Sequence, residues 1–375
     1  MSGPVRHLYV HLPFCAHRCG YCDFVTLVGR RQGHGAYVDG LLAELELERA
    51  LLADPVETVF LGGGTPTFTE PAALGRLLRA LPPAAEVTVE ANPESVTPAL
   101  AQMLREGGVT RISLGAQSFQ PRLLSLLERR AGPADVRAAV HTLRGACFDN
   151  ISLDLVYGIP GQTPAELARD LVEALALEPE HLSCYELEAK PGTRFTHRYG
   201  SELERQAEAL EGYFEQVVET LTGAGYRWYE TASFCRRAED AAGRDLRARH
   251  NLGYWLGREY LGLGIGAVST VGGLRWRNAP RLAGYLEALA TGETPPREVE
   301  ELPALVREQE RLLLGLRLDR GIELAGVRGA LDRGALARLE GGGLARISLE
   351  AGSERLELTH RGRFLGGGVA AELIA

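Results

Sequence analysis

The first half of the chain alternates short β-rich runs with helical patterns, and this alternation limits the fold more than any other feature. Strands are predicted at residues 7–12, 57–61, 86–90, 111–114, 150–155 and 181–186. Helices are predicted between them at residues 37–52, 71–80, 98–106, 134–144 and 164–177, and several open with a proline that favours a helix start. Strands joined by helices pair in parallel. The pattern therefore predicts an α/β fold built on a partial parallel (β/α)6 barrel.

The second half of the chain predicts a smaller unit after a connecting region. A long amphipathic helix is predicted at residues 201–222, and residues 291–303 have the composition of a linker. Helices at residues 305–318 and 324–341 precede an alternating stretch that resembles a β-hairpin. The expected organisation is a barrel over residues 1–225, a connecting region over 226–296 and a small helical, winged-helix-like domain over 297–375.

Polar or glycine-rich groups follow each predicted strand. In parallel barrels, the carboxyl ends of the strands carry the functional residues. The groups found there are the cysteines after residue 12, residues 62–65 (GGGT), 90–93 (EANP) and 117–119 (QSF), Asp154, and residues 185–186 (YE). Six loops are therefore expected to face one mouth of the barrel.

Three of the six cysteines lie within eight positions, as Cys15, Cys19 and Cys22. The CxxxCxxC spacing places three thiolates on one tight loop, where they can bind three irons of a cubane [4Fe-4S] cluster and leave the fourth iron open to an exchangeable ligand. The alternative is a zinc site completed by His11 or His17.

The net charge of the chain and the distribution of its cysteines indicate which binding partners and which cellular compartment to expect. A formal net charge of −8 disfavours nucleic acid as a partner. The sequence shows no secretory signal pattern, and no uncharged stretch reaches the ~20 residues that a membrane span requires. The clustered cysteines do not resemble a secreted disulfide framework. We expect a soluble, cytoplasmic protein in which Cys147, Cys184 and Cys235 are ordinary buried residues.

The segment HLPFCAHRCGYCDF resembles the cofactor loop of the radical-SAM superfamily, including the aromatic residue before the last cysteine. This resemblance implies a [4Fe-4S] cluster on the three cysteines and S-adenosylmethionine (SAM) on the open iron, where one-electron reduction cleaves SAM to a 5′-deoxyadenosyl radical. Tyr9 is then expected against the sulfonium of SAM. Other SAM contacts are expected from Gly63, Gly64, Thr65 and Glu90. A second adenosyl-binding set, whose occupancy stays open, is expected from Tyr21, Gln117, Arg129 and Asp154.

A finer resemblance, through LYVHLPFC, RISLGAQSF and DLVYGIPGQT, is to the branch that contains oxygen-independent coproporphyrinogen III dehydrogenase and the HemW-type heme chaperones. Two features favour the chaperones. The dehydrogenase carries a further cysteine two places after the third, where this chain has Phe24. In addition, residues 250–255 (HNLGYW) resemble the heme-associated HNxxYW signature of the chaperones.

An imidazole is a good axial ligand for heme iron, and aromatic rings can cover the macrocycle. His250 is therefore expected to associate with heme. Tyr254 and Trp255 are expected against the ring of the heme. The heme propionates are expected to pair with Arg244, Arg247 and Arg249.

The function that the resemblance implies is that of a heme chaperone, which binds heme and transfers it to acceptor hemoproteins. The alternatives are a coproporphyrinogen III dehydrogenase, which decarboxylates a porphyrinogen propionate, and a radical-SAM enzyme acting on a non-porphyrin substrate. Whether the chain is an enzyme, its oligomeric state and a transient contact with a membrane protein are left open.

Overall fold

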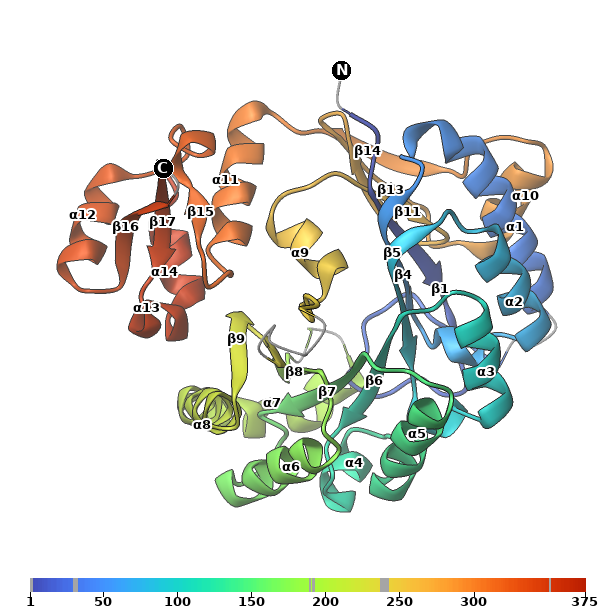
Figure 1. Ribbon diagram of the computed structural model, residues 1–375, viewed down its shortest axis with the longest axis horizontal. Helices are drawn as coiled ribbons and strands as arrows, with labels where there is room; N and C mark the ends of the chain where they lie inside the picture. The colour runs from blue at the N-terminus through green and yellow to red at the C-terminus, as the bar shows by residue number, and fades with distance from the viewer. Residues whose placement is uncertain (1–2, 30–32, 189, 191–192, 237–242, 351) are drawn as a thin grey trace.

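A curved sheet of twelve strands forms the centre of the molecule, with helices around its outer side (Figure 1). The computed structural model describes residues 3–29, 33–188, 190, 193–236, 243–350 and 352–375. Six strands pair in parallel and in chain order, which confirms the predicted parallel α/β core. They are β1 (His7–Leu12), β4 (Val56–Gly63), β5 (Ala84–Ala91), β6 (Arg111–Gln117), β7 (Ile151–Tyr157) and β8 (His181–Glu186).

Helices connect these strands and cover the outer face of the sheet (Figure 1). They are α1 (His34–Glu48), α2 (Pro71–Ala80), α3 (Pro98–Glu106), α4 (Pro121–Leu126), α5 (Pro133–Gly145) and α6 (Pro164–Ala176). Helix α6 shows why they begin where they do. The Thr163 hydroxyl accepts from the Glu166 amide and the Glu166 carboxylate accepts from the Thr163 amide, which satisfies two backbone donors just before Pro164.

The two faces of β1 show how the barrel separates its core from its site. Leu8 and Val10 are fully buried in the main hydrophobic core. Because successive side chains of a strand point to opposite faces, His7, Tyr9 and His11 lie on the inner face. The inside of the barrel is therefore polar, while the layer between sheet and helices is apolar.

The sheet continues across the boundaries expected at residues 225 and 296. Helices α7 (Arg194–Gln206) and α8 (Leu210–Gly223), joined by a 3₁₀ turn, replace the single helix predicted at residues 201–222. Strands β9 (Tyr226–Glu230) and β10 (Ser233–Arg236) then extend the sheet beyond β8.

At the other edge, β11 (Tyr260–Leu263) pairs in parallel with β1 and adds a seventh parallel strand. Antiparallel strands β12 (Val268–Val271), β13 (Leu274–Asn278) and β14 (Arg297–Glu301) follow it. The linker predicted at residues 291–303 is thus partly a strand, because cross-strand pairing orders a segment whose local composition resembles a loop. Helices α9 (Arg249–Trp255) and α10 (Leu282–Ala290) belong to the same region.

The C-terminal residues form a second hydrophobic core, around Leu312, Val327, Leu356 and Leu373. The predicted hairpin is present as β16 (Ala345–Glu350) and β17 (Ser353–Leu358), with β15 (Ile322–Glu323) beside it. The helices of this unit are α11 (Ala304–Gly315), α12 (Arg333–Gly341), α13 (His360–Phe364) and α14 (Gly366–Glu372).

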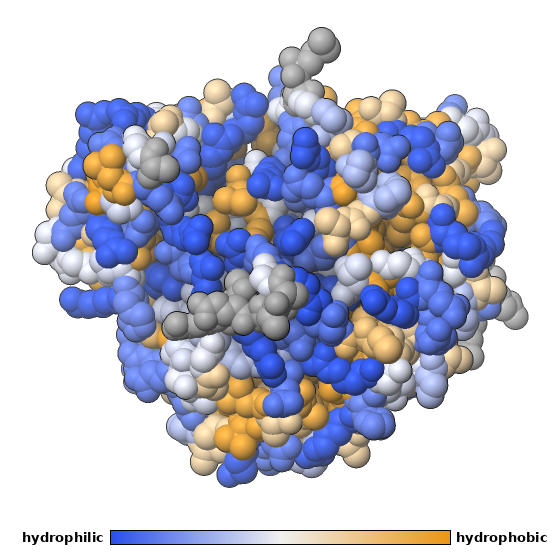
Figure 2. Space-filling model, in the orientation of Figure 1, coloured by the Kyte–Doolittle hydropathy of each residue, from blue (hydrophilic) through white to orange (hydrophobic). Residues whose placement is uncertain are grey.

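The surface of the molecule is mixed in character. Figure 2 shows polar side chains over much of one face, with separate apolar patches between them. Within the described ranges, none of the helices has the length and apolar character needed to span a bilayer.

Candidate functional site

A cavity of about 520 Å³ opens at the carboxyl ends of the parallel strands. It brings together most of the residues that the sequence singles out, from loops far apart in the chain. The expected residues that line it are Cys15, Cys19, Cys22, Tyr21, Gly63, Gly64, Thr65, Glu90, Gln117, Arg129 and Asp154. The structure therefore places the expected strand-end groups around one mouth, and we call this space the cysteine cavity.

The three cysteines of the loop line the same cavity and offer three sulfur ligands for a cluster. All are free thiols, and the Cys15 sulfur lies 3.5 Å from the Thr65 hydroxyl oxygen. Burial raises the pKa of Cys15 and Cys22, so bound iron would be needed to hold both as thiolates. Three thiolates on one loop can bind three irons of a cubane cluster and leave the fourth iron open to an exchangeable ligand.

Both histidines proposed as a fourth zinc ligand lie close to other polar groups. The His11 Nε2 atom donates to the Val25 carbonyl oxygen at 2.8 Å, and Nδ1 lies 3.0 Å from the Tyr9 hydroxyl. His17 lies 3.7 Å from the Glu128 carboxylate. The cluster interpretation is the one that the donor set supports.

The cysteines outside the loop differ from one another. Cys184 and Cys235 are buried, as the sequence predicts. Cys147 is exposed, in a turn where its φ is +62°, so the prediction that it is buried is wrong. The neighbouring Phe148 enters the core instead.

Two glycines at the end of β4 and directly after it allow the backbone to pass close to the cysteine loop. Gly63 has a φ of +112°, and a Cβ atom there would lie 2.6 Å from the His11 ring. A Cβ atom on Gly64 would lie 2.6 Å from the Pro13 carbonyl oxygen. A larger residue at either position would clash with its neighbours. Because the glycines have no side chains, a small ligand can come close to the backbone of this loop.

Glu90 and Asp154 place two carboxyl groups in the wall of the cysteine cavity. Burial raises the pKa of Glu90 to about 8, and the nearby Asp154 carboxylate adds to the shift. The Gly63 amide donates to the Glu90 carboxylate at 3.1 Å. Asp154 accepts hydrogen bonds from the Ser113 hydroxyl at 2.8 Å and the Ser152 hydroxyl at 3.3 Å. A cationic ligand in the cavity would favour the ionised form of Glu90.

Arg129 connects three loops of the cysteine cavity. Its guanidinium donates to the Asn92 side-chain oxygen at 2.9 Å and to the Gly115 carbonyl oxygen at 2.8 Å, and lies 3.9 Å from the Cys19 sulfur. Asn92 also donates to the Thr65 hydroxyl at 3.0 Å. Asn92 belongs to the strand-end group 90–93 expected at the mouth, and the structure gives it a role that the sequence does not assign.

Tyr9 lies close to Glu90 although it is not among the residues that line the cysteine cavity, since a Cβ atom on Gly62 would lie 3.1 Å from a side-chain atom of each. Tyr9 lines a neighbouring cavity, its hydroxyl contacts His11, and its ring stacks on Phe60 at 6.2 Å between centroids. Phe60 itself lines the cysteine cavity. The contact of Tyr9 with SAM stays a prediction.

His250 is not available as an axial ligand in this conformation, which corrects the sequence-based expectation. It is 1% exposed, its Nδ1 atom lies 2.8 Å from the Thr58 hydroxyl, and its Nε2 atom lies 2.8 Å from the Tyr254 hydroxyl. Both ring nitrogens therefore have hydrogen-bond partners. Burial lowers the pKa of His250 to about 3, so the ring is neutral at physiological pH.

Three other residues expected around heme, Trp255, Arg244 and Arg247, are also engaged elsewhere. The Trp255 ring packs under the Arg317 guanidinium at 4.2 Å from the ring centroid. Arg244 pairs with Asp149, and Arg247 pairs with Asp245, each at 2.7 Å. His250, Trp255, Arg244 and Arg247 therefore do not form the expected arrangement of ligand, ring cover and cations, whereas Tyr254 lines a neighbouring cavity.

Comparisons with known proteins agree with the fold and the cysteine loop. Residues 9–173 match the Radical SAM superfamily. The chain is 38% identical to the heme chaperone HemW of Mycobacterium tuberculosis over all of this chain and 96% of that protein. It is 33% identical to HemW of Bacillus subtilis over 85% of each chain. Among solved structures, coproporphyrinogen III oxidase (HemN) of Escherichia coli, a radical SAM enzyme, superimposes with a TM-score of 0.77 at 23% identity, covering 98% of this chain and 89% of that chain.

The fold, the cysteine loop and the matched residues define a radical SAM protein, a class whose members use a [4Fe-4S] cluster and SAM. Within this class, the chain belongs to the HemW family, because its similarity to the HemW proteins extends over its whole length.

Proposed function

We propose that this protein is a cytoplasmic heme chaperone, which binds heme and passes it to acceptor hemoproteins. The observation that carries the proposal is the identity of 38% to a heme chaperone along the entire chain. The position two residues after Cys22 supports it, because Phe24 stands where the dehydrogenase has a further cysteine. Six free cysteines are consistent with a reducing compartment.

The cysteine cavity would hold the cofactors in this proposal. Cys15, Cys19 and Cys22 would bind the cluster, and SAM would bind at Gly63, Gly64, Thr65 and Glu90. The reduced cluster supplies one electron, which can cleave SAM. The protein would position SAM through the close backbone of the glycine loop and the Glu90 carboxylate. Tyr21, Gln117, Arg129 and Asp154 would surround an adenosyl group.

The experiment that tests this proposal compares delivery with catalysis in one sample. The anaerobically reconstituted protein is titrated with hemin, mixed with an apo-hemoprotein acceptor, and separately incubated with coproporphyrinogen, SAM and a reductant. Saturable hemin binding followed by holo-acceptor formation, without consumption of coproporphyrinogen, is the expected result. SAM-dependent decarboxylation without hemin binding would establish the dehydrogenase instead.

A further inference from the structure

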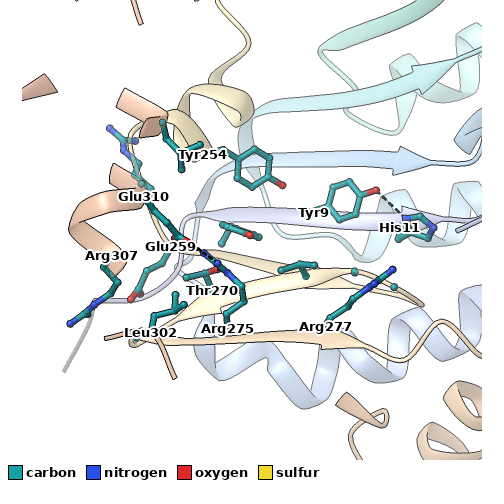
Figure 3. A pocket seen from close by; sticks show the side chains of 18 of the residues that line it. Tyr9, His11, Tyr254, Glu259, Thr270, Arg275, Arg277, Leu302, Arg307 and Glu310 are labelled. Atoms are coloured by element: carbon teal, nitrogen blue, oxygen red, sulfur yellow. Dashed lines mark hydrogen bonds and ion pairs between the residues drawn. The ribbon is translucent and has the colours of Figure 1, made fainter. Parts of the chain in front are cut away.

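A second cavity, of about 660 Å³, lies beside the cysteine cavity. Its walls are the inner face of β1, strands β11–β13, and helices α9 and α11 (Figure 3). Ligand sites commonly occupy roughly 300–1,000 Å³, so this space is large enough for a sizeable organic molecule. We call it the arginine cavity, after Arg258, Arg275, Arg277, Arg307 and Arg311, which line it.

Aromatic rings form much of the wall of the arginine cavity. Tyr254 and Tyr260 pack edge to face, with 4.7 Å between their ring centroids. Tyr9 on β1 and Phe24, which is 61% exposed, also line the cavity. Rings of this kind bind flat, largely apolar molecules.

Three arginines of the cavity, Arg277, Arg307 and Arg311, form no ion pair within the described residues, and Arg311 donates to the Gly326 carbonyl oxygen at 3.3 Å. Arg258 pairs with Glu57 at 2.8 Å, and Arg275 forms two contacts of 2.7 Å with Glu310. In the part of the chain that the structure describes, neither Arg277 nor Arg307 forms an ion pair or a side-chain hydrogen bond, and both side chains are exposed.

The acidic residues of the same cavity do not neutralise these two guanidinium groups. The Glu310 carboxylate is engaged by Arg275, and one Glu259 oxygen accepts from the Gly272 amide at 2.7 Å. Asp23 lies toward the cysteine loop. Figure 3 shows Arg277 and Arg307 well separated along the cavity. They are therefore free to pair with anionic groups of a ligand.

We infer that the arginine cavity is the heme site, in which the aromatic rings contact the macrocycle and Arg277 and Arg307 attract the heme carboxylates. This inference rests on the proposed function, which supplies heme as the ligand. Heme has a flat apolar ring, which matches the aromatic part of the cavity wall. Its anionic carboxylates match the two arginines. Carboxylate recognition by guanidinium is strong because the hydrogen bonds are charge-assisted.

The position of this cavity also explains how heme and SAM would influence each other. Asp23 and Phe24, directly after the cluster loop, line both cavities. Helix α9 lies between them, with Asn251 on the cysteine cavity and Tyr254 on the arginine cavity. A ligand in either cavity therefore contacts residues that also line the other cavity.

The test is a hemin titration of the reconstituted protein and of charge-reversal variants. Arg277→Glu and Arg307→Glu should each weaken hemin binding about tenfold or more, as expected for loss of a hydrogen bond to a charged group. Arg281→Glu, an exposed arginine at the start of α10 and outside the cavity, is the matched control and should bind like the wild type. The double variant, which carries both Arg277→Glu and Arg307→Glu, should bind hemin weakly. Hemin dimethyl ester, whose carboxylates are blocked, should bind the wild type equally weakly.

A cavity-filling variant makes the assignment independent of charge. Val268→Trp places an indole in the arginine cavity and should block hemin, while SAM binding, measured by calorimetry, stays unchanged. Wild-type affinity for hemin in the double variant and in Val268→Trp would overturn the cavity assignment and leave the proposed function standing. Failure of the wild-type protein itself to bind hemin would overturn both.

Discussion

The Nδ1 atom of His250 lies 2.8 Å from the Thr58 hydroxyl oxygen, which ties the start of α9 to β4 inside the barrel. This contact gives the histidine of the HNxxYW signature a structural role. A residue that joins two elements in the interior contributes to stability whether or not a ligand is bound.

Replacing His250 with alanine should lower stability more than hemin affinity. The change leaves the Tyr254 hydroxyl without its partner, whereas the Thr58 hydroxyl keeps its contact with His7 Nδ1 at 2.8 Å, and an unsatisfied buried group costs about 1–3 kcal/mol. Urea unfolding should therefore show a decrease of about 2 kcal/mol in the free energy of unfolding. His250→Gln, which retains hydrogen-bonding capacity, should lose less. Loss of hemin binding with unchanged stability would instead identify His250 as the ligand.

SAM affinity should rise with pH because of Glu90. Its pKa of about 8 means that the side chain is protonated and neutral below that pH, whereas the cationic ligand favours the carboxylate. Well below pH 8, the dissociation constant should fall by up to about tenfold per pH unit. Calorimetry across this range, with Glu90→Gln as the control for titration of SAM itself, measures the effect. Identical pH profiles for the two proteins would show that Glu90 does not contact the ligand.

Alanine at Cys15, Cys19 or Cys22 should abolish the visible absorption of the cluster after anaerobic reconstitution. Each thiol supplies one of only three protein ligands, so no spare ligand replaces it. Cys147→Ala, which removes an exposed cysteine outside the cavity, should reconstitute like the wild type. A cluster that survives all three loop substitutions would contradict the assignment of its ligands.

Removing the Arg129 guanidinium should lower the reduction potential of the cluster. A positive charge 3.9 Å from the Cys19 sulfur stabilises the more negative, reduced form. Arg129→Ala should shift the midpoint by on the order of tens of millivolts to more negative values, because net charge and hydrogen bonds to sulfur set cluster potentials. Arg129→Lys should shift it less. Redox titration monitored by electron paramagnetic resonance gives the potential, and Arg122→Ala, on the outer surface, should leave it unchanged.

Sequence patterns predicted the parallel core well, because strand and helix periodicities and helix starts such as Thr163–Pro164 are local properties. They also predicted that residues from six strand ends, Glu90 and Asp154 among them, would meet, because parallel strands end at the same edge. The prediction failed for Cys147, since a run of neighbouring apolar residues does not say which of them turns outward.

By itself, the sequence determined the class of cofactor loop and the parallel barrel, because three cysteines at fixed spacing and a repeated alternation act over short stretches of chain. Only the tertiary structure decided that β11 pairs with β1, that His250 is enclosed between Thr58 and Tyr254, and that an arginine-lined cavity lies beside the cysteines. These outcomes depend on contacts between residues far apart in the chain. Local propensity carries no information about which distant partner a short strand, a histidine or an arginine will meet.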